Sequence, residues 1–201
     1  ALVVVRDTSE PGFGTPMVRI TPFGPGASER PSWRQFYKTE GNNVLQGSQF
    51  GHLGDGSSWS IAASPFYEPE MVEVYSSLGG NQQWFQPVDG DRVSAALPKK
   101  VTPPSPVLMG SDGIANSFFG TYIYIEGYWD GFFFFGTSAA APTAAAVAAL
   151  GLEIEPGLSP DQLIKLMEDT ADPNVTNPYT IAGTPNDRVF GAGLINAQAF
   201  V

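Results

Sequence analysis

The sequence predicts an α/β domain, and three observations support this prediction. Short apolar or alternating segments, typical of β-strands, occupy much of the chain before residue 136. Between residues 139 and 149, eight of the eleven positions are alanine, the residue with the highest helix propensity. A second helix start is indicated at Ser159, where Pro160 and Gln162 complete the pattern of a capping box. Strands followed by helices in a chain of 201 residues indicate one unit with a substantial core.

Several segments have the composition of extended structure. They contain β-branched or aromatic residues, or alternate in polarity, and turns rich in Gly, Pro and Ser separate them. We expect strands at residues 1–5, 17–20, 59–66, 71–80 and 107–113, and a hairpin or pair of strands within 117–135. Residues 81–106 show little periodicity and are expected to form an extended insertion.

The helices differ in character. Alanine permits close packing, so the alanine-rich helix is expected to be buried on all sides rather than amphipathic. Pro142 is expected near its first turn, where a missing N–H costs least. The helix that follows Ser159 has an apolar face formed by Leu163, Ile164 and Met167. A glycine-rich entry at residue 191 leads to a third, short helix at the end of the sequence.

Charge and composition exclude several classes of function. Ten basic residues against twenty acidic ones give a net charge of −10, which argues against nucleic-acid binding because that requires clustered Lys and Arg. Cysteine is absent, which excludes disulfides, thiolate zinc sites and cysteine catalysis. No segment is expected to cross a membrane. The acidic balance suits a soluble exported protein, either extracellular or periplasmic.

The junction Gly136-Thr137-Ser138 lies between four phenylalanines and the alanine-rich helix. Glycine allows a sharp turn and the close approach of a ligand. A serine at a helix N-terminus lies where unpaired N–H groups and the helix dipole favour developing negative charge, so its own N–H could form half of an oxyanion hole. The alternative is that Thr137 or Ser138 is simply the helix N-cap.

Four blocks of sequence resemble one family. "GTSAAAPTAAAVAAL", beginning at Gly136, resembles the nucleophile segment of the subtilisin-like serine peptidases, the subtilases. "FGAGLINAQAF", beginning at Phe190, is similar to the closing region of that family, and "LSPDQLIKLMEDTA" is similar to its helix that starts at Ser-Pro. "PVLMGSDGI" resembles a further stretch, from which Ser105, Val107 and Gly110 depart.

The resemblance implies a fold and a reaction. The fold would be a subtilisin-like three-layer α/β fold with a mostly parallel sheet and a buried nucleophile helix. Ser138 would be the catalytic nucleophile, and its backbone N–H would form part of the oxyanion hole. The substrate would be a peptide or protein, and no cofactor would be required. The whole chain, 1–201, would be the C-terminal portion of one catalytic domain, with residues 1–50 poorly matched and 51–201 bearing the nucleophile.

The resemblance also requires an aspartate, a histidine base and an oxyanion asparagine. The sequence contains one histidine, His52, followed by a glycine loop rather than by a helix of small residues. The preferred interpretation places the triad Asp and His on an N-terminal half of the domain, as a separate or missing chain that would be a partner. The alternative is a triad of Asp7, His52 and Ser138. Asn42 and Asn43 are candidates for the oxyanion side chain.

Other functions stay open at this point. The chain could be a catalytically silent subtilase-like binding or structural protein. It could also be a sedolisin-type serine peptidase, which uses a glutamate base, for which Glu40, Glu68 and Glu70 are available. Residues 170–187 are rich in Asp, Asn and turns, so they leave room for a structural calcium ion, although no metal ligand can be assigned.

Overall fold

The computed structural model describes most of the chain after residue 56 and a few positions before it. The described residues are 36–37, 44–45, 49, 53–54, 56–73, 75–81, 83–86, 90, 95–117, 120–127, 129–176 and 185–201. The strands predicted at residues 1–5 and 17–20 lie outside them.

A parallel pair of strands forms the centre of the described structure. Strand β3 (Ile61–Pro65) pairs with β6 (Leu108–Asp112) residue by residue. Nearly every position in both strands is buried, as expected for a parallel pair covered on both faces. The strands predicted at 59–66 and 107–113 are therefore confirmed. The described structure is α/β, but its other sheets are antiparallel.

The core lies on both faces of this pair. Because neighbouring side chains of a strand point to opposite faces, Leu108 and Met109 enter different clusters. Leu108 packs with residues of the helices, including Val147 and Met167. Met109 packs on the other side; its cluster contains Ala62, Val72, Leu78, Val189 and Phe190.

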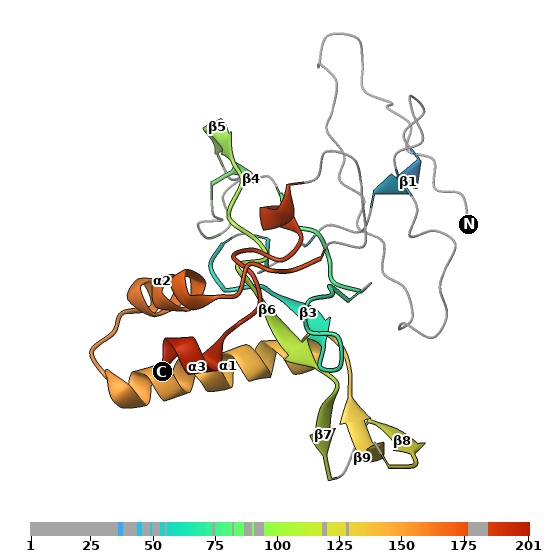
Figure 1. Ribbon diagram of the computed structural model, residues 1–201. Helices are drawn as coiled ribbons and strands as arrows, with labels where there is room; N and C mark the ends of the chain where they lie inside the picture. Colours follow the sequence, from blue (N-terminus) through green and yellow to red (C-terminus); the bar gives the residue numbers. More distant parts are fainter. Residues whose placement is uncertain are drawn as a thin grey trace.

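Helix α1 (Thr137–Ile154) is the alanine-rich helix, and it lies along β3 and β6 (Figure 1). The expectation that it is buried on all sides is wrong in the described structure. Ala139, Ala144 and Val147 are among its buried residues, whereas Leu150 and Ile154 are exposed. By length and composition alone α1 could cross a membrane, contrary to expectation, although core helices of soluble proteins meet the same criterion. Its packing on β3 and β6 is the arrangement of a core helix.

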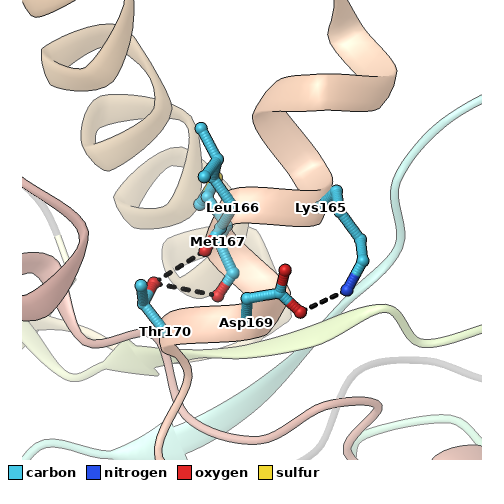
Figure 2. A network of polar contacts seen from close by, with 5 residues as sticks. All are labelled: Lys165, Leu166, Met167, Asp169 and Thr170. Carbon is cyan, nitrogen blue, oxygen red and sulfur yellow. Dashed lines mark hydrogen bonds and ion pairs between the residues drawn. The ribbon is translucent and has the colours of Figure 1, made fainter.

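Helix α2 (Pro160–Thr170) begins where the sequence predicts. The Ser159 hydroxyl accepts the Gln162 N–H at 3.3 Å, and the Gln162 side chain accepts the Ser159 N–H at 2.9 Å, which forms the capping box. At the other end, the Thr170 hydroxyl donates to the Leu166 carbonyl, and Lys165 pairs with Asp169 (Figure 2).

The C-terminal region completes this layer. Helix α3 (Ala197–Phe200) begins at Asn196, whose side chain accepts the Ala199 N–H. Phe200 packs against the cluster around Leu108. A short 3-10 helix, η3 (Asn186–Arg188), precedes the glycine-rich entry.

The aromatic segment forms a small antiparallel sheet. Strands β7 (Ile114–Asn116), β8 (Thr121–Ile125) and β9 (Trp129–Phe134) pair in the order β7-β9-β8. This confirms the expected pair of strands within 117–135. The sheet projects away from β6, and β9 leads back to the start of α1 (Figure 1).

Two other expectations need correction. Residues 81–106 contain an antiparallel pair, β4 (Gln83–Phe85) and β5 (Ala96–Val101), rather than only extended chain. The described residues of 71–80 contain no regular strand; the segment bonds to β3 through single contacts such as Glu73 N–H to the Ala63 carbonyl. Its alternating pattern reflects inward packing of Val72 and Leu78 rather than a regular ladder. A further short pair joins β1 (Phe36–Tyr37) to β2 (Val44–Leu45).

Candidate active site

The predicted nucleophile lies in the first turn of α1. Gly136 is the N-cap, with φ 118° and ψ 162°, and no side chain caps this helix. A positive φ in this region is readily adopted only by glycine. The Gly136 carbonyl accepts the N–H groups of Ala139 and Ala140, so Thr137 and Ser138 are helical residues. The alternative in which Thr137 or Ser138 caps the helix is therefore wrong, and Ser138 is exposed.

The N-terminus of α1 is suited to an anion. The first N–H groups of a helix have no intrahelical acceptor, and the helix dipole makes this end positive. In α1 no side chain cap and no acidic residue in the first turn occupies these donors. The Ser138 N–H is one of them, and it belongs to the same residue as the exposed hydroxyl. The geometry can therefore place a hydroxyl beside a donor for a developing oxyanion.

Pro142 changes the second turn of α1. The helix begins at Thr137, so Pro142 is its sixth residue and lies beyond the first turn, near which it was predicted. Its missing N–H would have bonded the carbonyl four residues earlier, which is that of Ser138. Pro142 therefore removes the ordinary helical donor to the Ser138 carbonyl.

The start of α1 rests closely on β6. A Cβ atom added at Gly110 would lie 2.7 Å from the Ala140 carbonyl oxygen, closer than real Cβ atoms come. This close approach of helix and strand requires glycine at position 110, one of the departures from the family stretch. A Cβ added at Gly113 would lie 2.7 Å from the Phe135 ring, one residue before the N-cap.

A buried carboxylate joins β6 to the same turn. Asp112 is fully buried, and its Oδ2 accepts the Gly136 N–H at 2.7 Å and the hydroxyl of Tyr75. Burial raises the pKa of Asp112 above its ordinary value, while the bonds from Tyr75 and Gly136 act in the opposite direction. Burial and the bond to Asp112 raise the pKa of Tyr75, so the phenol is neutral at neutral pH.

The aromatic side chains before the site divide between the two faces of the β7-β9-β8 sheet. On one face Phe133 is buried and stacks on Phe66, with ring centroids 5.8 Å apart, and Trp129 lies 4.9 Å from Phe66. On the other face Tyr122 and Phe132 are exposed and contact each other. Packing against Phe66 thus accompanies the burial of Phe133, whereas Tyr122 and Phe132 stay exposed.

Most of the remaining candidate residues cannot be placed relative to Ser138. Asp7, His52, Asn42, Asn43 and Glu40 lie outside the described residues. Glu68 and Glu70 lie in the turn after β3, where the Glu68 N–H bonds the Pro65 carbonyl and the Glu70 carbonyl accepts the Thr176 N–H.

The candidate calcium segment is described only in part. The Asp172 carboxylate accepts both N–H groups offered by Asn174, from its backbone at 2.9 Å and its side chain at 2.8 Å. Among the described residues, no three acidic or histidine side chains gather as a metal site would require. A structural calcium ion stays a prediction.

Sequence reasoning missed Asp112 and Tyr75. The signal for Asp112 was a carboxylate at the end of the apolar run Val107 to Gly110, where burial of the strand buries the charge. Tyr75 carried no such signal, because its segment was expected to be a regular strand.

Comparison with known proteins relates the segment around this site to a family. The model of the subtilase family matches residues 133–193, which span the end of β9, all of α1 and α2, and the glycine-rich entry to the C-terminus. No curated protein matches the chain. The matched segment includes the Gly136 turn and the exposed Ser138. Residues 133–193 therefore match the subtilase family of serine peptidases, which confirms the predicted resemblance for this part of the chain.

Proposed function

We propose that the chain is the nucleophile-bearing part of a subtilisin-like serine endopeptidase. The observation that supports this most directly is the exposure of Ser138 in the uncapped first turn of α1, within the segment that matches the subtilase model. An exposed hydroxyl beside unpaired N–H donors is the arrangement that acyl transfer requires.

In the proposed reaction the Ser138 hydroxyl attacks the carbonyl carbon of a peptide bond. A histidine base takes the hydroxyl proton as the oxygen–carbon bond forms, and the Ser138 N–H donates to the oxyanion. The carbon–nitrogen bond then breaks, and the base returns the proton to the departing amine. Water hydrolyses the acyl-enzyme in the same way and restores Ser138. This reaction requires no cofactor.

The histidine and aspartate are proposed to lie on an N-terminal half of the domain, which would complete a three-layer fold with a mostly parallel sheet. The exposed part of α1 supports such a partner. Leu150 and Ile154, about one turn apart, are exposed on this helix, as is Leu152, and a neighbouring segment that covered them would bury apolar surface. We further propose that the enzyme is exported.

Covalent labelling tests the assignment of Ser138. The complete natural assembly containing this chain should react with a fluorophosphonate, and peptide mapping should locate the adduct on Ser138. Ser138→Ala should abolish both labelling and peptide hydrolysis. The matched control is Ser159→Ala, because Ser159 is also at a helix N-terminus but its hydroxyl is occupied in the capping box. Labelling that persists in Ser138→Ala would exclude Ser138 as the nucleophile.

The same experiment separates the alternatives. A folded, complete assembly that does not label would favour the catalytically silent subtilase-like protein. If labelling occurs, substitution of the base decides between the two peptidase types. Loss of labelling on replacing a histidine favours the subtilisin-type base, and loss on replacing Glu40, Glu68 or Glu70 favours the sedolisin type.

A further inference from the structure

Asp112 has an unusual environment for a carboxylate that bonds no cation among the described residues. It closes β6, is fully buried, and is anchored by two donors that come from different parts of the chain. Tyr75 approaches from the segment after β3, and Gly136 from the turn before α1. Both bond to Oδ2, while Oδ1 is buried without a hydrogen-bond partner in the described structure.

Burying the Asp112 carboxylate in this way costs folding free energy, so the structure has to gain something from it. A buried carboxylate loses its hydration, and a buried oxygen without a donor is not compensated. A neutral side chain, such as that of asparagine, could also accept the Gly136 N–H. Charge-assisted hydrogen bonds are, however, shorter and stronger than neutral ones, which favours a carboxylate where a turn must be held firmly.

The turn in question needs such an anchor. Gly136 adopts a conformation outside the helical region and has no side-chain cap. It is two residues from Ser138, so rotation about its backbone would move the Ser138 hydroxyl and N–H together. On one side the close approach of Gly110 to Ala140 limits movement toward β6. The bond from Gly136 to Asp112 limits movement away from β6.

We propose that Asp112 is a positioning residue for the nucleophile: it holds the Gly136 N–H, with Tyr75 fixing the carboxylate from the other side, and so sets the reactivity of Ser138. This inference rests on the proposed function. Asp112 does not touch the substrate. It acts through the turn, and its removal should slow acylation while leaving substrate affinity nearly unchanged.

Three variants of the complete assembly test the proposal. Asp112→Ala removes the acceptor, Asp112→Asn keeps one oxygen for the Gly136 N–H but removes the charge, and Tyr75→Phe removes only the second donor. The matched control is Asp130→Ala. Asp130 also accepts a tyrosine hydroxyl, from Tyr122 at 2.5 Å, but that pair is exposed. Folding of each variant is checked by circular dichroism and thermal unfolding.

The readouts are the rate constant of fluorophosphonate labelling at Ser138 and the separate kcat and KM for a peptide substrate. Asp112→Ala should lower the labelling rate and kcat about tenfold or more, with KM within about twofold. Asp112→Asn should recover part of the rate, Tyr75→Phe should cause a smaller loss, and Asp130→Ala should behave as wild type. Amide exchange at residues 133–141 should rise in Asp112→Ala and stay unchanged in Asp130→Ala.

The outcomes are distinguishable. A folded Asp112→Ala that labels at the wild-type rate would overturn the positioning role while leaving Ser138 as the nucleophile. A loss expressed mainly in KM, or an equal loss in Asp112→Asn and Asp112→Ala, would also count against it. Should Asp112→Ala fail to fold, Asp112→Asn and Tyr75→Phe decide the question, and wild-type rates in both would refute it. If the wild-type assembly itself does not label, the proposed function fails first and the positioning role fails with it.

Discussion

The two long helices of this chain begin in different ways. Helix α2 is started by its own neighbours in sequence, because Ser159 and Gln162 satisfy each other's backbone N–H groups. Helix α1 has no side-chain cap, and the anchor of its first turn comes from Asp112, 24 residues earlier, on a buried strand. The N-terminus of α2 is capped by residues next to it in the sequence, whereas that of α1 is anchored by a residue distant in the sequence.

The difference follows from what each end must do. A capping side chain occupies N–H donors that a ligand would otherwise use. The end of α1 has to keep its donors available for an oxyanion in the proposed reaction, so its stability has to come from contacts elsewhere. The end of α2 has no such role in the proposal and can be capped fully. Substitutions at the two ends should therefore separate stability from reactivity.

The largest loss of stability is expected in the packing beneath both helices. Met167 of α2 is buried and packs in the cluster with Leu108 and Val147. Met167→Ala should lower the free energy of unfolding by about 2–5 kcal/mol, because it removes buried contacts and leaves a cavity. Urea unfolding measures this. The neighbouring exposed Leu166→Ala is the control, and an equal loss there would show that α2 does not dock as described.

A smaller effect is expected at the start of α1. Gly136→Ala should cost about 1–3 kcal/mol, because alanine is strained at φ 118°. Gly136→Ala should also reduce labelling of Ser138, because the backbone would rotate to relieve the strain and would move the Ser138 hydroxyl. Gly157→Ala is the control, since a Cβ there meets open space and that residue has no positive φ. Unchanged stability and labelling in Gly136→Ala would mean that the turn is not specified by glycine.

At the start of α2, Ser159→Ala should cost about 1 kcal/mol through loss of the capping box. Ser159→Asp should restore most of it, because a carboxylate also accepts the Gln162 N–H and favours the helix dipole. Labelling of Ser138 should be unchanged in both. Altered labelling would show that the N-termini of α1 and α2 are coupled and do not act independently.

The pH dependence of stability should show a further, smaller effect, because burial and the two hydrogen bonds act on the pKa of Asp112 in opposite directions. Its pKa is raised on folding, so the folded state binds the proton more tightly than the unfolded state. The resulting stability is fully present below the unfolded pKa and is lost as pH rises through the folded pKa.

Denaturant unfolding of wild type and Asp112→Asn between pH 3 and 7 measures this, and only wild type should lose this stability on raising the pH. Tyr75 faces Asp112 directly, the charge of Glu73 also acts on Tyr75, and the neutral phenol of Tyr67 feels the charge of Asp112. A greater loss in Asp112→Asn than in wild type would contradict the sign.

The smallest effect is expected on the exposed surface of α2. The hydrogen bond to Asp169 raises the pKa of Lys165, but the pair is solvent-exposed and salt screens it (Figure 2). Lys165→Met should leave the unfolding midpoint unchanged within error, at low and at high salt. A clear destabilisation would indicate that the pair contributes more than exposed pairs normally do.

The elements with a local signal were predictable. The capping box fixed the start of α2, and short buried apolar runs located β3 and β6. The segment 71–80 was not predictable, because its alternation arises from packing of Val72 and Leu78 against β3 rather than from a ladder. The β4–β5 pair was missed because its residues do not alternate in polarity as a strand does. Pairing between two separate segments is also not visible in the sequence of either one.

In the candidate site, too, one residue has a local sequence signal and the other has none. Ser138 could be proposed as the nucleophile from the sequence, because the Gly-Thr-Ser turn and the helix that follows are contiguous. Asp112 was not, because its role depends on which strand lies beneath α1.

By itself, then, the sequence determined the α/β character, the start of α2 and the likeness of residues 133–193 to the subtilase family, and it proposed Ser138 as the nucleophile. The tertiary structure decided that the end of α1 is open rather than capped. It also placed Gly110 against Ala140 and connected Asp112 to Gly136. The physical reason is that the Gly136 turn is stabilised by contacts between segments that are far apart in the sequence. No single stretch of sequence contains both partners of such a contact.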